Sequence, residues 1–274
     1  MCSSNYPVVL SIAGSDSGGG AGIQADLKTI SALGCFATTA ITAITVQNTL
    51  GVAGIHPVPA EIVTGQIKAV IEDLKPSAIK IGMVYSAALA MAVADTLSQY
   101  PAIPIIFDPV MLTSTGDSLI EDRTATAFKD LLFPLAELIT PNLDEAAVLA
   151  RFEVTTIPDM EKAAYRLLQY SCSAVLIKGG HLAGSELCDF YLHKNGDARM
   201  FRSNKIDTKN THGTGCTLSA AIASFLALGD DLATAIAKSK AYTHEAIEHG
   251  KHASIGAGHG PLNHFFDPQR LAVV

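Results

Sequence analysis

The residues best suited to chemistry lie in the run from Thr208 to Thr217, which reads TKNTHGTGCT and precedes an apolar, Ala-rich stretch at 218–228. Glycines and small residues at a helix start leave the first backbone N–H groups free, and the helix dipole adds positive potential there. Such a helix start binds anions of phosphate size. Cys216 would lie in the same potential, which favours its thiolate. The run therefore predicts an anion site beside a candidate base, which points to phosphoryl transfer.

The elements that must position this run alternate along the chain. We expect strands at 8–13, 36–46, 78–81, 103–107, 138–140 and 174–177, and helices at 21–33, 87–97, after Asn142, at 215–228 and at 230–249. Residues 187–193 and 198–201 read as a hairpin with a type I′ turn at Asn195-Gly196. Alternation of this kind is typical of a parallel sheet covered by helices on both faces. Because no linker or repeat interrupts it, we expect one α/β domain over residues 1–274.

The chemically suggestive side chains all follow predicted strands. In open α/β sheets, ligands bind beyond the carboxyl ends of the strands. The residues at those ends are Gly14 to Gly22, Gln47-Asn48, Gly82-Met83, Asp108, Asn142 to Glu145, and Lys178 to Gly180. Their placement predicts one site along this edge of the sheet.

Charged residues at these ends suit phosphate and magnesium. Asp108 and Glu145 are carboxylates at neighbouring strand ends, and Mg²⁺ binds through few protein ligands together with water and phosphates. Glu145 fits equally well as a first-turn helix acid that faces the dipole. Lys178 follows an apolar strand, where its charge needs a partner such as a phosphate, unless the side chain reaches out to solvent.

Other classes of protein fit less well. The segment 20–25 resembles a dinucleotide fingerprint, but no acid follows within 38–48, so we interpret it as a tight loop whose glycines admit a small substrate. No P-loop or protein-kinase motif set is present. A net charge of −7 and the lack of a Lys/Arg cluster argue against nucleic-acid binding.

Composition also bears on the compartment. No apolar run reaches membrane-spanning length, and no basic segment precedes the first apolar stretch, so we expect a cytoplasmic protein without membrane contact. We expect reduced thiols at Cys2, Cys35, Cys172, Cys188 and Cys216. We expect most of the later histidines in loops or at the surface: His244, His249, His252, His259 and His264.

Taken in order, the motifs form a pattern that covers nearly the whole chain. They are AGSD at 13–16, GGAGIQADLKT at 19–29, QNT at 47–49, IGM at 81–83, DPVM at 108–111, TPN at 140–142, KGGH at 178–181, the run 208–217 and GHGP at 258–261. This pattern resembles the ribokinase superfamily, and more closely the hydroxymethylpyrimidine/phosphomethylpyrimidine kinases of thiamine biosynthesis. The resemblance implies a three-layer α/β/α sandwich with a mostly parallel sheet, the use of ATP and Mg²⁺, and a homodimer.

The resemblance also implies residue roles. Gln47 hydrogen-bonds the aminopyrimidine ring, as a side-chain amide can, because it has both a donor and an acceptor. Pocket residues beside it are Gly14, Asp26 and Met83. The transferred phosphoryl group is cradled by Gly213, Thr214, Gly215 and Cys216. Lys178 contacts ATP phosphates, Asp108 and Glu145 lie near Mg²⁺, and the nucleotide side holds Asn142, Thr211 and Lys240.

The base stays open at this point. Much of the superfamily has aspartate where this chain has Cys216, so the base is Cys216, Asp26 or, in a substrate-assisted transfer, no protein group. Three further residues depart from the family pattern, namely Gly18 for a common serine, Ser114 for a common lysine in a segment that closes over phosphates, and Val46 for a usual alanine.

The expected activity is ATP-dependent phosphorylation of 4-amino-5-hydroxymethyl-2-methylpyrimidine to its monophosphate and then to its diphosphate. A pyridoxal or pyridoxine kinase on the same fold is the alternative. It ranks second because such kinases differ at the QNT and KGG segments, which this chain keeps. A non-catalytic binding protein would be expected to lack Asp108, Lys178 or the glycine loop, and all three are present.

Overall fold

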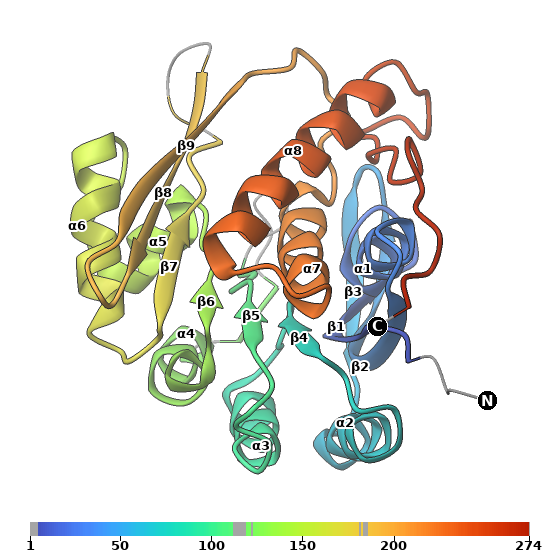
Figure 1. The fold of residues 1–274 in the computed structure, drawn as a ribbon, viewed down its shortest axis with the longest axis vertical. Coiled ribbons are helices and arrows are strands. Elements are labelled where there is room, and N and C mark those ends of the chain that lie inside the picture. Colours follow the sequence, from blue (N-terminus) through green and yellow to red (C-terminus); the bar gives the residue numbers. More distant parts are fainter. Residues whose placement is uncertain (1–4, 112–118, 122, 181, 183–185, 274) are drawn as a thin grey trace.

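A computed structural model describes residues 5–111, 119–121, 123–180, 182 and 186–273 (Figure 1). The strands of this part of the chain form one nine-stranded sheet in the order β3-β2-β1-β4-β5-β6-β7-β8-β9. Neighbours from β2 to β7 pair in parallel, whereas β3, β8 and β9 pair antiparallel at the two edges. The strands are β1 (Val8–Asp16), β2 (Phe36–Asn48), β3 (Gly51–Pro57), β4 (Ala78–Ile81), β5 (Ile105–Phe107), β6 (Leu138–Ile139), β7 (Ala174–Ile177), β8 (Glu186–His193) and β9 (Ala198–Asn204).

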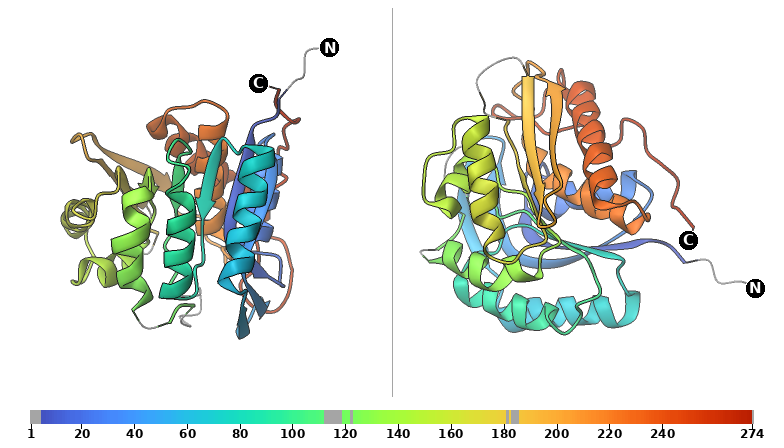
Figure 2. Two further views of the ribbon diagram at one scale, coloured as in Figure 1. Left: turned by 90° about the horizontal axis from the view of Figure 1, so that it is seen from below. Right: turned by 60° about the vertical axis from the view of Figure 1, so that its left-hand side comes forward.

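Helices cover both faces of the sheet, as Figure 2 shows from two further directions. One layer contains α2 (Ala60–Leu74), α3 (Ala87–Leu97), α4 (Thr124–Ala127) with the short turns η1 (Phe128–Leu132) and η2 (Phe133–Leu135), α5 (Leu143–Ala150) and α6 (Ile157–Leu168). The other layer contains α1 (Gly22–Ala32), α7 (Thr214–Ala227) and α8 (Leu232–Gly250). None of these helices has the length and apolar character needed to cross a membrane.

The alternation of side chains along each strand divides the core in two. Phe107 of β5 packs with α3 and against the ring of Phe128, with ring centroids 5.1 Å apart. Ile106, its neighbour in the strand, packs instead with Leu218 of α7 and Ile236 of α8. Apolar residues therefore fill both faces of the central strands, which is why those strands read as continuous apolar runs.

This architecture confirms the predicted three-layer α/β sandwich with a mostly parallel sheet. The predicted strands and helices are present, and the structure adds β3, α2, α6 and α4 with the turns η1 and η2, to which the sequence analysis assigned no element. The predicted type I′ turn is wrong. Gly196 has φ +90°, but Asn195 does not have the positive φ that this turn requires. Instead, residues 194–197 form a longer loop in which the Asn195 side chain accepts a bond from Asp197 N.

Candidate active site

The candidate site lies where the parallel strands end. β1, β2, β4, β5, β6 and β7 point the same way, so their carboxyl ends share one edge of the sheet. The start of α7 packs onto this edge. Three groups of residues meet there: the first turn of α7, a charged cluster beneath it, and a polar cluster at the end of β2.

The first turn of α7 is built around a glycine. Gly213 is the residue before the helix and has φ +86°, and a Cβ there would lie 1.8 Å from the carbonyl oxygen of Gly20. Thr214 then bonds to the Thr211 carbonyl through its amide (3.2 Å) and its hydroxyl (2.7 Å). The first backbone bond of the helix is the one that Thr217 N donates to Gly213 O at 2.9 Å. The amides of residues 215 and 216 come before Thr217 in the first turn. These amides can bind an anion, as the sequence predicts.

The charged cluster lies directly under that turn. Lys178 Nζ lies 2.7 Å from Asp108 Oδ1 and 4.0 Å from Glu145 Oε2. A Cβ on Gly215 would lie 3.2 Å from Lys178 Nζ and 3.4 Å from Asp108 Oδ2, so a larger residue would push these side chains aside by a few tenths of an ångström. Burial favours a lower pKa for Lys178, but the charges of Asp108 and Glu145 raise it, so the ammonium stays protonated. Thr140 donates to the same Asp108 oxygen at 2.9 Å.

The structure confirms Glu145 as a first-turn helix acid. Asn142 N donates to Glu145 Oε2 at 2.7 Å and Glu145 N donates to Asn142 Oδ1 at 2.8 Å, which is a capping box at the start of α5. The same carboxyl also faces Lys178. Burial raises the pKa of Glu145 to about 7, and the nearby Asp108 charge acts in the same direction. The Asn142 side chain is occupied by the cap.

These residues fit a magnesium ion held largely by its other ligands. In the described part of the chain, no group of three or more His, Cys, Asp and Glu residues forms a metal site by itself. Mg²⁺ commonly binds one or two carboxylates together with water and phosphates. Asp108 and Glu145 are both buried, and the charge of Asp108 helps to raise the pKa of Glu145. A divalent cation between them would offset the repulsion between the two carboxylates.

The expected thiolate at Cys216 is wrong. Burial raises the pKa of Cys216 to about 11, although Lys80 and the Gly22 amide act in the opposite direction. The loss of water around the sulfur outweighs the helix dipole, which the sequence alone could not reveal. Near neutral pH this side chain is therefore a thiol and a poor base.

Asp26 has a different position from the one expected. Its carboxylate is fully buried and lies 2.9 and 2.8 Å from Lys80 Nζ, while Ser11 Oγ donates to it at 2.5 Å. Burial raises the pKa of Asp26 against the opposing charge of Lys80. With no exposed surface, the Asp26 side chain pairs with Lys80 and does not line a pocket in this structure. Sequence reasoning missed Lys80, although a lysine inside the four-residue buried strand β4 was a usable signal.

Gly14 and Met83 are brought together as expected. A Cβ on Gly14 would lie 3.0 Å from Met83 Sδ, so the glycine leaves room for the methionine. Thr42 holds the methionine in place by donating to its carbonyl at 2.6 Å. The last residues of β1 and the segment that follows β4 therefore lie together at the sheet edge.

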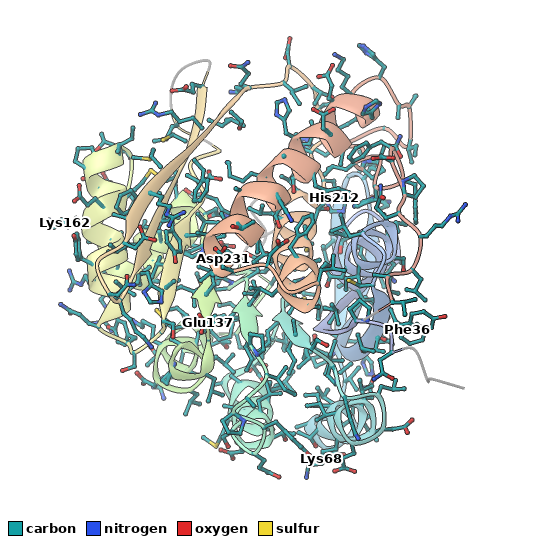
Figure 3. All side chains as sticks on the ribbon, in the orientation of Figure 1. Phe36, Lys68, Glu137, Lys162, His212 and Asp231 are labelled. Atoms are coloured by element: carbon teal, nitrogen blue, oxygen red, sulfur yellow. The ribbon has the colours of Figure 1, made fainter. Side chains whose placement is uncertain are left out.

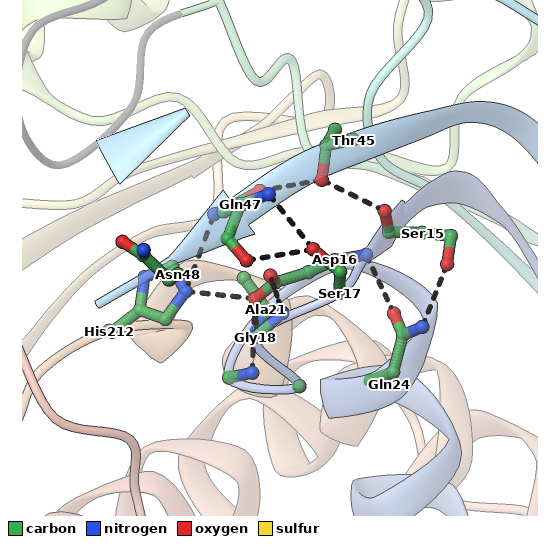
Figure 4. Close-up of polar contacts among 12 residues, drawn as sticks. Ser15, Asp16, Ser17, Gly18, Ala21, Gln24, Thr45, Gln47, Asn48 and His212 are labelled. Atoms are coloured by element: carbon green, nitrogen blue, oxygen red, sulfur yellow. Dashed lines mark hydrogen bonds and ion pairs between the residues drawn. The ribbon is translucent and has the colours of Figure 1, made fainter. Parts of the chain in front are cut away.

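Gln47 belongs to a polar cluster that the sequence analysis did not recognise (Figure 4). Its amide nitrogen lies 3.4 Å from His212 Nε2, and its amide oxygen lies 3.0 Å from Thr45 Oγ1. His212 Nε2 also lies 2.9 Å from Asp16 Oδ2. Figure 3 shows His212 beside α7 and the N-terminal elements that it contacts. His212 was visible only as part of the TKNTHGTGCT run.

The glycines of the loop after β1 face protein atoms, whereas the sequence analysis interpreted them as making room for a small substrate. A Cβ on Gly20 would lie 2.3 Å from the ring of His212, and one on Gly22 would lie 2.3 Å from Gly14 O. On Gly18 it would meet Asp16 Oδ1 at 3.1 Å. These glycines therefore make room for protein groups, and the loop shapes the site by packing.

The remaining expected residues lie around this core. Lys240 of α8 forms an ion pair with Asp189, and Asp189 accepts from Gly179 N at 2.8 Å, so Lys240 is linked through Asp189 to the backbone that follows Lys178. His264 lies in a turn after α8, within the expectation of loop or surface positions for most of the late histidines, and its side chain is buried. Ser114, His181 and Cys2 lie outside the described residues.

Comparison with known proteins agrees with this geometry. Residues 16–263 match the phosphomethylpyrimidine kinase family. The hydroxymethylpyrimidine/phosphomethylpyrimidine kinase of Rhizobium meliloti is 47% identical, over 94% of this chain and 97% of its own length. The thiamine biosynthesis bifunctional protein ThiED of Geobacter sulfurreducens is 45% identical over 93% of this chain, and the chain spans about half (52%) of that protein.

Two solved structures share the fold. Phosphomethylpyrimidine kinase from Clostridium difficile is 41% identical with a TM-score of 0.78, covering 88% of this chain and 99% of that one. The ADP complex of Bacillus subtilis pyridoxal kinase is 32% identical with a TM-score of 0.86, covering 95% and 98%. The family match and the 47% relative agree with the site geometry, and the chain belongs to the phosphomethylpyrimidine kinase family.

Proposed function

We propose that this protein phosphorylates 4-amino-5-hydroxymethyl-2-methylpyrimidine to its monophosphate and then to its diphosphate, using ATP, in thiamine biosynthesis. One observation carries the proposal. His212 contacts Gln47, and the next residue, Gly213, opens the anion-binding turn above Lys178 and Asp108. A single loop therefore joins a ring-recognition amide to a phosphate site, as a kinase for a small heterocyclic alcohol requires.

The ring is bound at the ends of β1, β2 and β4. The Gln47 amide pairs with the amino group and a ring nitrogen, because it carries a donor and an acceptor side by side. Gly14 and Met83 form the wall against which the ring packs, supported by their close approach. Asp26 contributes indirectly, through Lys80, to the charge beneath this wall.

The transferred phosphoryl group lies at the first turn of α7. The amides of Gly215 and Cys216 bind its oxygens, and the turn from Gly213 to Thr214 sets their direction. Lys178 neutralises charge on the ATP phosphates. The nucleotide side of the site is formed by Asn142, Thr211 and Lys240.

Asp108 and Glu145 would hold Mg²⁺, because they are the two buried carboxylates beside Lys178. When bound, the ion neutralises phosphate charge. Lys178 now bonds Asp108, so it is already oriented toward the position that phosphates would take.

The transfer relies on positioning. Cys216 remains a thiol and Asp26 is closed off by Lys80, so neither is placed to act as base. We therefore favour the substrate-assisted route, in which the hydroxymethyl oxygen bonds phosphorus, the bond to ADP breaks, and the hydroxyl proton passes to a phosphate oxygen. Phosphoryl transfer needs little more than alignment and charge stabilisation.

The assembly is part of this proposal. We propose a homodimer of single kinase domains, supported by the exposed apolar side chains of Ile44, Val46 and Leu50 at the β2–β3 end. Light scattering should give twice the monomer mass, and Val46→Glu should lower it toward the monomer. A cytoplasmic location is supported by the free thiols of Cys35, Cys172, Cys188 and Cys216.

Pyridoxal phosphorylation is the second candidate, favoured by the similarity to Bacillus subtilis pyridoxal kinase. The test compares kcat/KM for the pyrimidine and for pyridoxal in three enzymes, namely wild type, Gln47→Leu and a control, Gln99→Leu. Gln99 is exposed and lies two residues after the end of α3. Loss of two hydrogen bonds to the ring should raise KM for the pyrimidine by about 10-fold or more in Gln47→Leu only. An unchanged KM would remove Gln47 from ring recognition, and a wild-type preference for pyridoxal would favour the second candidate.

A further inference from the structure

The polar cluster around Gln47 is linked by hydrogen bonds whose directions can be assigned. It comprises Asp16, Ser15, Thr45, Gln47 and His212, drawn with their contacts in Figure 4. Assigning the proton on each bond in turn fixes the orientation of the Gln47 amide, which is the group proposed to recognise the substrate ring.

Asp16 sets the direction from one end. Its carboxylate accepts from the amides of Gly18 (2.7 Å), Gly20 (3.0 Å) and Ala21 (2.8 Å). Although burial opposes it, the bonds from His212 and these amides lower the pKa of Asp16, so the group is ionised and can only accept.

His212 must therefore donate. Its Nε2 lies 2.9 Å from Asp16 Oδ2, so this nitrogen carries the proton. Gly20 leaves room for the ring at this position, since a Cβ there would lie 2.3 Å from it. That proton is given to Asp16, so the atom of Gln47 that lies 3.4 Å from Nε2 faces an N–H group whose proton it can only share with Asp16.

Thr45 sets the direction from the other end. Its hydroxyl has one proton and lies 3.0 Å from the Ser15 carbonyl, which can only accept. The same hydroxyl lies 3.0 Å from the end of the Gln47 amide. Since its proton is used by Ser15, Thr45 can offer Gln47 only a lone pair.

His212 and Thr45 therefore favour the same orientation of the Gln47 amide, with its oxygen toward His212 and its nitrogen toward Thr45. The contact of Gln47 Nε2 with His212 Nε2 at 3.4 Å instead sets two donors against each other, and a half-turn of the amide relieves this. We propose that His212, held by Asp16, is a specificity-determining positioning residue that fixes the donor–acceptor order of the Gln47 amide.

This order matters for the ring, on the proposed function on which the inference rests. The 4-amino group donates and the adjacent ring nitrogen accepts, whereas the 4-oxo analogue presents an acceptor beside a ring N–H. A fixed amide matches one order and leaves polar atoms facing like partners with the other, which is how hydrogen-bonding sites reject analogues. A freely turning amide would accept both.

The test measures the ratio of kcat/KM for the 4-amino substrate to that for its 4-oxo analogue. His212→Phe keeps the ring but removes the donor, and His212→Gln places an amide N–H near the position of Nε2. We expect the ratio to fall by about 10- to 100-fold in His212→Phe and to stay near wild type in His212→Gln. Thr45→Val, which removes the lone pair at the other end, should lower the ratio too.

The control is His249→Phe, the same change at an exposed position on α8. Its ratio should equal that of wild type. An unchanged ratio in His212→Phe, in an enzyme that phosphorylates the 4-amino substrate, would overturn the inference and leave the proposed function standing. A wild type without activity on the 4-amino substrate would overturn the proposed function and the inference together. If His212→Phe does not fold, the Thr45→Val ratio decides.

Discussion

Lys80 and Asp26 form an ion pair whose disruption has a predictable cost. Neither side chain has exposed surface, and Lys80 Nζ lies within 2.9 Å of both Asp26 oxygens. Lys80→Met would leave the carboxylate with only the Ser11 hydroxyl. Removing one partner of a buried pair costs about 3–5 kcal/mol, because the remaining charge stays out of water.

Equilibrium unfolding in guanidinium chloride measures this cost. On a typical total stability of about 5–15 kcal/mol, the loss is large and should move the midpoint clearly, without a change in m-value. Asp26→Leu should cost a similar amount, because it leaves the ammonium unpaired.

The double variant Lys80→Met/Asp26→Leu separates the explanations. Replacing both charges with apolar groups removes the unpaired charge, so we expect it to be more stable than either single variant. A loss below about 1 kcal/mol in Lys80→Met, or a double-variant loss equal to the sum of the single ones, would refute the reasoning.

Three further predictions follow from the site and core. Gly215→Ala should leave the free energy of unfolding equal or higher by up to about 1 kcal/mol, because alanine favours a helix over glycine. It should lower kcat, because the new Cβ would lie 3.2 Å from Lys178 Nζ. Gly65→Ala on α2, where nothing lies within 4 Å of the added Cβ, is the matched control in thermal melts and rate measurements. Iodoacetamide should alkylate Cys216 slowly at pH 7 and faster as pH rises toward its pKa of about 11, and rapid labelling at pH 7, measured by mass spectrometry, would contradict this raised pKa. Burial lowers the pKa of His264 to about 4, against 6.5 in the unfolded chain. Its contribution to the free energy of unfolding is therefore present above pH 6.5, and about 3 kcal/mol is lost as the pH falls from 6.5 to 4. His264→Gln should flatten the plot of stability against pH in this window, and an unchanged slope would show that His264 is not the group responsible.

Much of the site could be predicted because it depends on local patterns. Short apolar runs followed by Gln47, Asp108 or Lys178 place these residues at one sheet edge, since parallel strands end on the same side. The glycines before Cys216 likewise indicate a tight turn into a helix, and α7 begins at Thr214.

The rest depends on contacts between distant segments. Lys80 pairs with a carboxylate 54 positions earlier, and His212 reaches Asp16 across 196 positions. The pKa of Cys216 follows from its burial, which no local pattern reports. Glycines 18, 20 and 22 suggested room for a ligand, whereas their neighbours are protein atoms.

In the proposed function, a single site adds two phosphoryl groups to the hydroxymethylpyrimidine, one after the other. Mass spectrometry of the products formed by the purified protein with Mg-ATP and 4-amino-5-hydroxymethyl-2-methylpyrimidine tests it most directly. We predict the monophosphate first and the diphosphate after it. Formation of no phosphorylated pyrimidine, with phosphorylation of pyridoxal under the same conditions, would contradict the account.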